Sequence, residues 1–194
     1  MAAELVETFN LGDLVYEIYN DKPDFELLEL KQIHSNIVIS GCEWKEGAQA
    51  DGVIANLNEL TPLAIRTADC LPIALIGNSS VANIHAGWRG LHQKILHSQA
   101  LSNINPHTAI IGPHISEKSY EVGPEFKDHF QSHVSQRDDS LFLNLSMVAK
   151  EQIHDYFGPI KTIISKECTY QNAKLNSFRL NKTDKRNYNI LRLK

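Results

Sequence analysis

Two histidines and one cysteine in this chain are of the types that bind transition metals. His34 lies on the polar face of a β-branched stretch, Cys70 at a polar bend between two apolar runs, and His85 at the end of a third run. Two imidazoles and a thiolate suit Zn²⁺, and three protein ligands leave a fourth position open, as in catalytic zinc sites. Zinc lowers the pKa of a bound water to about 7, which would provide a nucleophile at neutral pH.

The same residues permit two other chemistries. Cys70 as nucleophile with His85 as its base would make a cysteine hydrolase, which needs no metal and is inactivated by alkylation. A thiolate with imidazoles also binds copper tightly, so copper-dependent phenol oxidation is a further alternative. The chain has no further histidine pairs at ligand spacing that would complete a multicopper cluster. A folded domain with a vestigial, inactive site is the remaining alternative.

Apolar patterning predicts the elements that position His85. Residues 81–84 are short or β-branched and predict a core strand that ends at His85. Gly87 and Gly90 then allow a tight turn, and a weak apolar stripe predicts a helix over 91–100. A strand, a glycine turn and a helix of this kind form the corner in which α/β proteins commonly bind ligands.

The other two candidate ligands are placed by two further β predictions. Residues 31–39 predict a strand with Gln32 and His34 on one face. Residues 63–76 contain two apolar runs, which predict a bent strand or hairpin with Asp69 and Cys70 at the bend. Pro72 lacks an N–H group for a strand ladder, so it favours an edge or a bulge there.

The remaining pattern predicts a mixed α/β fold. Further strands are predicted over 14–19, 51–55, 108–114, 160–165 and 188–193, and further helices over 123–134 and 145–156. Several strands interleaved with about three helices are typical of a mixed α/β architecture. The chain shows no internal repeat or linker, so we expect one domain over 1–194.

Composition narrows the class of protein. A chain of 194 residues with 42% hydrophobic residues is typical of a globular domain, and its net charge of −4 gives no basic surface for nucleic acid. No signal peptide or membrane-spanning stretch is apparent, so we expect a cytoplasmic protein that does not bind membranes. The three cysteines are too few for a disulfide framework.

Several sequence blocks together resemble one known family. The blocks, in chain order, are Gln32-Ile33-His34, Thr67-Ala68-Asp69-Cys70-Leu71-Pro72-Ile73, His85-Ala86-Gly87-Trp88-Arg89-Gly90, Gly112-Pro113-His114-Ile115 and Glu167-Cys168-Thr169. They resemble the laccase-domain family, once called multicopper polyphenol oxidases. Its members are now described as zinc-containing purine nucleoside phosphorylases with adenosine deaminase activity, and they are also linked to editing of peptidoglycan precursors.

The resemblance implies a fold, a substrate class and a set of site residues. The implied fold is a single-domain layered α/β/β/α sandwich with mixed sheets. The implied substrates are phosphate and a purine nucleoside such as adenosine, inosine or methylthioadenosine, and a monomer or weak homodimer is expected. The family's hydrolase-like fold also keeps the Cys70–His85 alternative open, with an amide or a peptidoglycan precursor as substrate.

Matching the family's motifs position by position assigns roles to individual residues. The metal ligands fall on His34, Cys70 and His85, with zinc as the expected metal and copper possible. Asp69 and Arg89 match positions beside the ligands and are expected to act in catalysis; the alternative is a structural ion pair between them. Expected substrate contacts are Gln32, Arg66 and His114. Arg66, Arg89 and the helix N-terminus after Gly90 are the candidates for holding phosphate.

Overall fold

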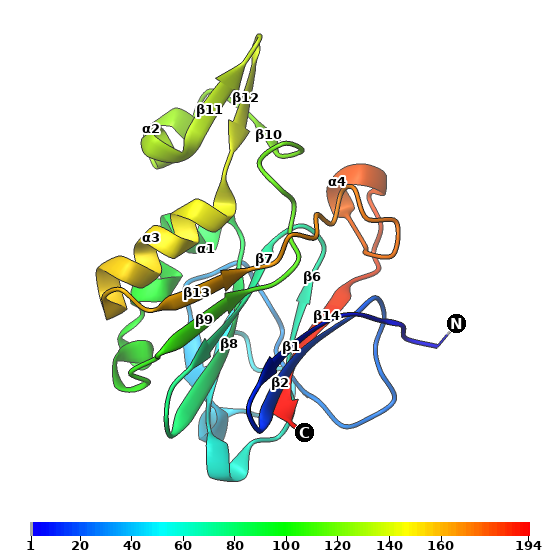
Figure 1. Cartoon of the computed structure of the whole chain (residues 1–194), viewed down its shortest axis with the longest axis vertical. Helices are drawn as coiled ribbons and strands as arrows, with labels where there is room; N and C mark the ends of the chain where they lie inside the picture. Colours follow the sequence, from blue (N-terminus) through cyan, green and yellow to red (C-terminus); the bar gives the residue numbers. More distant parts are fainter. Residues whose placement is uncertain (1) are drawn as a thin grey trace.

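Two mixed β-sheets packed face to face form the body of the protein (Figure 1). The computed structural model describes residues 2–194. The six-stranded sheet contains, in spatial order, β13 (Lys161–Ile164), β9 (Thr108–Ile111), β7 (Leu71–Ile76), β8 (Ser80–Ala86), β5 (Gly52–Asn56) and β4 (Val38–Ser40). The five-stranded sheet contains β1 (Leu5–Leu11), β2 (Leu14–Tyr19), β14 (Asn187–Leu193), β6 (Leu63–Thr67) and β3 (Leu28–Glu29).

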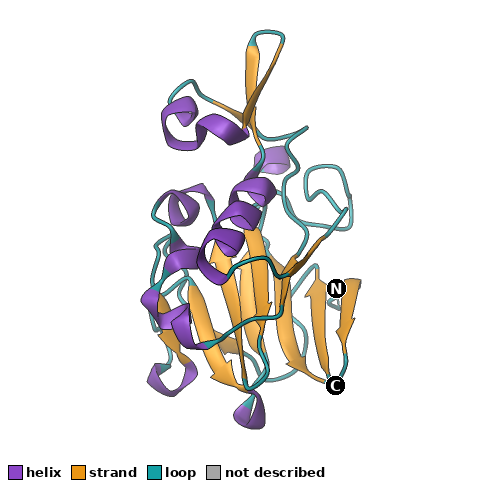
Figure 2. Cartoon of the chain, turned by 60° about the vertical axis from the view of Figure 1, so that its left-hand side comes forward, coloured by secondary structure: helices purple, strands orange, loops and turns teal. Residues whose placement is uncertain are grey.

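The α-helices are α1 (Trp88–His92), α2 (Phe126–Phe130), α3 (Leu145–Phe157) and α4 (Phe178–Asn181). Helices α1 and α3 cover the outer face of the six-stranded sheet, and α2 adds two phenylalanines to the same apolar cluster (Figure 2). Short 3₁₀ turns occur at Gly41–Glu43, Leu57–Glu59, Ile95–His97, Gln99–Asn103 and Gln131–His133. A small third sheet projects from the body and contains β10 (Glu121–Val122), β12 (Ser140–Leu143) and β11 (Val134–Arg137). None of the helices within residues 2–194 is long and apolar enough to cross a bilayer.

The apolar runs of the sequence form strands because both faces of the six-stranded sheet are covered. In β7, Leu71, Ile73 and Leu75 pack towards the helices, whereas Ala74 and Ile76 pack against the five-stranded sheet. All six residues of β7 are buried. A strand buried on both faces has a continuous apolar sequence. Each fully buried aliphatic side chain contributes roughly 1.5–3 kcal/mol to the free energy of folding. The mixed α/β prediction is confirmed.

Two predicted helices and the predicted setting of Pro72 differ from what is observed. The predicted helix over 91–100 is α1, which begins at Trp88 and ends at His92, followed by Lys94 at φ 57° and by 3₁₀ turns. The helix predicted over 123–134 ends at Phe130, because Val134 begins strand β11. Pro72 lies in an interior strand, where its carbonyl accepts the Gly112 N–H, and the ladder with β9 begins only at Ile73. Its missing N–H therefore leaves no gap in that ladder.

The two apolar runs over 63–76 belong to different sheets. β6 lies in the five-stranded sheet and β7 in the six-stranded sheet, so residues 68–70 cross from one sheet to the other. The predicted bend is confirmed, while the hairpin alternative is wrong because β6 and β7 are not hydrogen-bonded neighbours. Asp69 sits at this crossing with φ 94°, and Cys70 follows it immediately. The crossing therefore places both side chains at the rim between the two sheets.

Candidate metal centre

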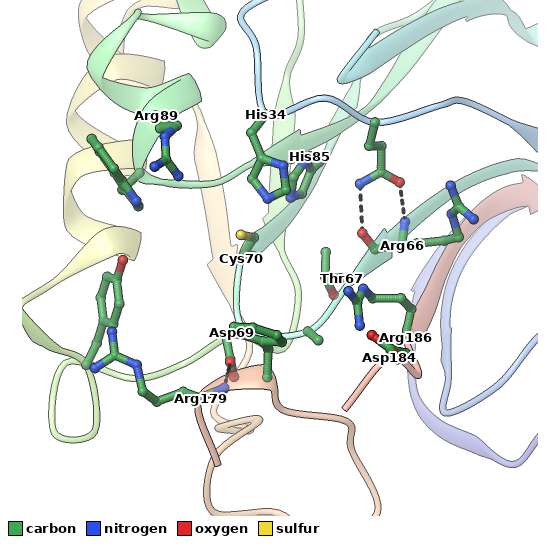
Figure 3. Close-up of a pocket in the computed structure, with 15 residues that line it drawn as sticks. His34, Arg66, Thr67, Asp69, Cys70, His85, Arg89, Arg179, Asp184 and Arg186 are labelled. Atoms are coloured by element: carbon green, nitrogen blue, oxygen red, sulfur yellow. Dashed lines mark hydrogen bonds between the residues drawn. The ribbon is translucent and has the colours of Figure 1, made fainter. Parts of the chain in front are cut away.

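The two histidines and the cysteine predicted as ligands are brought together. The nearest ligand atoms of His34, Cys70 and His85 all lie within 4.8 Å of one another. The two imidazole rings are 4.7 Å apart and nearly perpendicular, at 85°. His34 is exposed, Cys70 half-buried and His85 buried, so the group opens to solvent on one side (Figure 3). This group could hold a metal ion.

The loop that carries His34 differs from the sequence prediction. Residues 32–37 form a loop with bends, and the strand begins only at Val38. His34 itself has φ 59°, a left-handed conformation that is uncommon for a residue other than glycine. The predicted alternation of Gln32 and His34 on one strand face is therefore wrong. His34 reaches the cluster from a loop, while His85 comes from the end of strand β8.

Asp51 holds this loop and His85 with a single buried carboxylate. Its side chain is fully buried and accepts the Nδ1 hydrogen of His85 at 2.8 Å. The same carboxylate accepts the backbone N–H groups of Ile33, His34 and Ser35 at 3.3, 3.0 and 2.6 Å, and the Ser35 hydroxyl at 2.7 Å. Because His85 donates through Nδ1, its Nε2 is left for a metal. Zinc-binding histidines commonly donate their other ring N–H to a carboxylate in this way.

The role of Asp51 was not predicted from the sequence. The pair Asp51-Gly52 at the start of a strand is typical of an ordinary turn. Its carboxylate instead contacts backbone groups 16 to 18 residues away. No local sequence signal marks a residue whose partners are this distant.

The charges in this group favour a thiolate. Burial raises the pKa of the Cys70 thiol, but the neighbouring His85 and His34 outweigh it and lower the pKa to about 6. Burial lowers the pKa of His85, yet Cys70 and Asp51 raise it to about 9. Burial also opposes ionisation of Asp51, but hydrogen bonds from His85 and Ser35 lower its pKa to about 2. A thiolate and imidazoles are the donors that Zn²⁺ prefers, so the donor set fits the metal.

Gly87 packs directly against two of the three ligand side chains. A Cβ atom at this position would lie 3.0 Å from the Cys70 Sγ and 3.4 Å from the His34 Cδ2. The backbone of Gly87 is extended, at φ −76° and ψ 172°, so steric room rather than backbone freedom favours glycine here. The space beside the cluster is therefore filled by backbone alone.

We expect Gly87→Ala to weaken metal binding by at least about tenfold, because an added methyl group would displace the Cys70 sulfur from its ligand position. Competition with a zinc chelator measures the affinity. Gly12→Ala is the matched control: Gly12 has φ 69° and an open surrounding, so this variant strains the backbone without approaching the cluster. Equal zinc affinities for Gly87→Ala and wild type would contradict the prediction.

A cavity of about 630 Å³ lies over the His34–Cys70–His85 group. Of the other residues predicted for the site, Gln32, Arg66, Asp69 and Arg89 line this cavity. His114 does not line it; this side chain is buried, and its Nδ1 lies 2.9 Å from the Gly112 carbonyl oxygen. Burial lowers the pKa of His114. The structure thus brings together every predicted site residue except His114.

Asp69 and Arg89 do not form the ion pair considered from the sequence. Within residues 2–194 no carboxylate lies within 4.0 Å of the Arg89 guanidinium, which instead lies 4.4 Å from the centre of the Trp88 ring. The Asp69 carboxylate accepts the hydroxyls of Thr169 and Ser177, each at 2.7 Å, and the Arg179 backbone N–H at 2.6 Å. Asp69 thereby fixes the C-terminal segment against the cavity.

The side chain of Gln32 binds the backbone of Arg66. Its Nε2 donates to the Arg66 carbonyl at 2.7 Å, and its Oε1 accepts the Arg66 N–H at 2.8 Å. Both polar ends of this amide are occupied, so Gln32 acts on the cavity by positioning β6. The Arg66 guanidinium remains partly exposed and donates to the Leu30 carbonyl.

Eight further residues complete the cavity lining. They are Thr67, Ala68, Trp88, Tyr120, Phe178, Arg179, Asp184 and Arg186. The C-terminal segment supplies four of them, and its sequence Ser177-Phe178-Arg179 followed by Lys185-Arg186 was the only sign of this role. The Arg179 guanidinium lies 5.0 Å from the centre of the Tyr120 ring. The wall therefore combines flat aromatic surface with four guanidinium groups.

Comparison with known proteins identifies the family. Residues 14–193 match the family described as multi-copper polyphenol oxidoreductase laccase. The chain is 37% identical over 144 residues to a purine nucleoside phosphorylase of Aquifex aeolicus, an alignment that covers 71% of this chain and 68% of that protein. It is 29% identical over 168 residues to the purine nucleoside phosphorylase YfiH of Escherichia coli, with 79% of this chain and 68% of that protein covered.

Solved structures show the same fold. A Neisseria meningitidis protein of the DUF152 family superposes with a TM-score of 0.82 at 20% identity, covering 100% of this chain and 99% of that one. The Bacillus licheniformis protein YfiH superposes with a TM-score of 0.78 at 18% identity, covering 93% of each chain. The family match spans both sheets and all three candidate ligands, so this chain belongs to the multi-copper polyphenol oxidoreductase laccase family, whose YfiH-like relatives are named purine nucleoside phosphorylases.

Proposed function

We propose that this protein is a zinc-dependent purine nucleoside phosphorylase that also deaminates adenosine. The observation that carries the proposal is the position of the His34–Cys70–His85 group at a cavity with both aromatic and arginine walls. A cavity of about 630 Å³ is within the size range of sites for small organic ligands. The names of the Aquifex and Escherichia relatives support the same reaction class.

Phosphorolysis requires a phosphate oxygen to form a bond to ribose C1′ while the bond from C1′ to the purine nitrogen breaks. The base leaves with the bonding electron pair and takes up a proton, giving free base and ribose 1-phosphate. We assign orthophosphate to Arg89 and Arg179, whose guanidinium groups face the cavity beside Trp88 and Tyr120. Arginine forms paired hydrogen bonds with phosphate oxygens.

The aromatic side chains and a metal held by His34, Cys70 and His85 would supply the remaining functions, which are binding of the purine and activation of the substrate. Trp88, Tyr120 and Phe178 offer ring faces for stacking a purine. A bound zinc ion would supply Lewis acidity that polarises a substrate group. We assign proton transfer in deamination to Asp69, the carboxylate that directly precedes Cys70 and lines the cavity.

Zinc is the metal we favour over copper. Within residues 2–194 only one group of three or more metal-binding side chains lies close enough to hold an ion. Four-electron reduction of O₂ by a multicopper enzyme requires several copper ions, and this group can hold one. Two imidazoles and one thiolate with an open fourth position are typical of catalytic zinc.

The test is product identification from inosine. Zinc-loaded protein is incubated with inosine in phosphate buffer, and we expect hypoxanthine and ribose 1-phosphate in equal amounts. Adenosine under the same conditions is expected to give adenine, inosine and, from that inosine, hypoxanthine. Protein stripped by a chelator should be inactive and should recover on addition of zinc. Absence of ribose 1-phosphate from the zinc-loaded protein would contradict phosphorolysis.

A cysteine hydrolase is the second candidate, favoured by the Cys70–His85 ion pair. With the pKa of Cys70 at about 6 and that of His85 at about 9, the thiolate and the imidazolium are present together between these values in the metal-free protein. A nucleophilic cysteine is activated by such a neighbouring imidazolium. A metal held by the same sulfur would block this chemistry. A zinc enzyme therefore requires the Cys70 sulfur to be bound to the metal, whereas a cysteine hydrolase requires it to be free.

We expect iodoacetamide to alkylate Cys70 readily in stripped protein and at least about tenfold more slowly after zinc loading, because the metal occupies the sulfur. In stripped protein the rate should fall as the pH is lowered through about 6, where the thiolate becomes protonated. Peptide mass spectrometry follows Cys70, with exposed Cys42 as the internal reference. Equally fast alkylation with and without zinc would favour the cysteine hydrolase.

A further inference from the structure

Arg66 and Arg186 come from adjacent segments of the chain in space. Arg66 lies in β6, and Arg186 lies directly before β14, the strand that pairs with β6 in the five-stranded sheet. Asn187, the first residue of β14, lies opposite Thr67, the residue after Arg66. Both arginines line the cavity.

This pair lies apart from the arginines assigned above to orthophosphate. Figure 3 shows Arg89 and Arg179 on one side of the metal cluster, and Arg66 and Arg186 on the other. The cavity therefore presents two separate cationic ends with the metal group between them. One orthophosphate ion held by Arg89 and Arg179 would leave the other end without an anion.

The Arg186 guanidinium is held in place with hydrogen-bond donors still free. Its Nη1 donates to the carbonyl oxygens of Thr183 at 2.9 Å and Lys185 at 2.8 Å. Within residues 2–194 no acceptor is bonded to its Nε or Nη2. A guanidinium with a fixed plane and two free N–H groups on one edge matches the geometry of two phosphate oxygens.

Carboxylates near this pair do not balance its charge. Glu29 lies 3.8 Å from the Arg66 Nε and is shared with Lys22. Asp184 lines the cavity, but no ion pair within 4.0 Å joins it to any arginine of the described residues. Arg186 therefore has no ion-pair partner among the described residues, and its charge favours an anion in the cavity.

We propose that Arg66 and Arg186 form a second phosphate-binding subsite, across the metal cluster from Arg89 and Arg179. The inference rests on the proposed function, which places a nucleoside and orthophosphate in the same cavity. The phosphate group at the second subsite has two possible sources. It is either the 5′-phosphate of a nucleoside monophosphate substrate or a second free orthophosphate ion.

The two sources are separated by binding measurements on zinc-loaded protein. Inosine and inosine 5′-monophosphate are titrated calorimetrically in phosphate-free buffer, where neither is phosphorolysed and neither has a 6-amino group to lose. A phosphate ester source predicts that the monophosphate binds at least about tenfold more tightly than inosine. A free-ion source predicts equal binding of the two, with two orthophosphate ions bound per chain by equilibrium dialysis.

Arg186→Gln tests the subsite, and Lys185→Gln is the control at an exposed neighbour outside the cavity lining. In the ester case Arg186→Gln should remove the advantage of the monophosphate over inosine, a loss of about 10- to 100-fold in the ratio of the two affinities. In the free-ion case it should reduce the bound orthophosphate from two ions to one. Arg66→Gln, a change in strand β6, should give the same result as Arg186→Gln in each case. Agreement between the two variants would show that the effect does not come from local misfolding of residues 183–186.

The proposal is overturned if inosine and its monophosphate bind equally and the orthophosphate count is the same in wild type and both arginine variants. This failure is distinguishable from failure of the proposed function. Normal phosphorolysis of inosine with no effect of Arg66 or Arg186 on binding removes the subsite alone. Absence of phosphorolysis, with the monophosphate advantage present and dependent on Arg186, supports the subsite and removes the proposed function.

Discussion

Cys70→Ala is expected to reduce bound zinc from about one ion per chain to less than about 0.1, and to slow phosphorolysis of inosine at least about 10³-fold. The variant removes the only thiolate among the three candidate ligands, and two imidazoles alone hold zinc weakly. A loss of 10³-fold in rate corresponds to about 4 kcal/mol of transition-state stabilisation, within the several kcal/mol that a catalytic metal supplies. Elemental analysis and product assay on the same samples check both expectations.

Cys168→Ala is the matched control for this experiment. Cys168 is also a free cysteine, but it is buried, its Sγ accepts the backbone N–H of Ser116, and it is not part of the His34–Cys70–His85 group. We expect this variant to keep its zinc and its activity while losing some stability from the buried sulfur. If Cys70→Ala kept one zinc ion per chain, the metal would be bound elsewhere and the proposed site would be wrong.

Two of the three candidate ligands could be positioned from the sequence because they border strands with strong apolar patterns. The run Leu71–Ile76 is buried on both faces, and strand β8 is buried along its whole length. These strands pair directly, with Leu71 opposite Ala86 and Pro72 opposite His85. A buried antiparallel pair fixes its register, so Cys70 and His85 meet wherever the two runs pair.

His34 could not be positioned in this way. Its neighbours Ile33, Ile37 and Ile39 have the β-branched character of a strand, and that pattern predicted one. The loop forms because the N–H groups of residues 33–35 bond to the Asp51 carboxylate and not to a neighbouring strand. A long-range contact with a buried charge overrides local β propensity here, and no pattern within 31–39 records it.

The C-terminal part of the cavity was missed for a similar reason. Arg179 and Arg186 lie more than 90 residues beyond the ligand positions in sequence, and only the folded chain brings them to the cavity. Asp69 makes this possible, because it binds Ser177 and the Arg179 N–H across more than 100 residues. Sequence blocks identify such residues as belonging to a family motif, but their neighbours in space depend on the sheet order.

Asp51→Asn is expected to weaken zinc binding by about 10- to 100-fold, the usual cost of losing a carboxylate that orients a metal-binding histidine. The carboxylate both fixes the Nδ1–H form of His85 and holds His34 in its left-handed conformation. An asparagine amide offers one oxygen where the carboxylate offers two, so it cannot satisfy the three backbone N–H groups and His85 together. One substitution therefore disturbs two ligands at once.

The same variant should lower the free energy of unfolding of the metal-free protein by about 3–5 kcal/mol, as expected when one member of a buried ion pair is removed. Asp184→Asn is the control, because Asp184 lines the cavity but has no contact with a ligand histidine among the described residues. Chelator competition measures the zinc affinity, and urea unfolding of stripped protein measures stability. Unchanged zinc affinity in a destabilised Asp51→Asn protein would show that Asp51 supports the fold alone. A decrease in both zinc affinity and stability would show that this one buried carboxylate positions both the loop and the metal ligands.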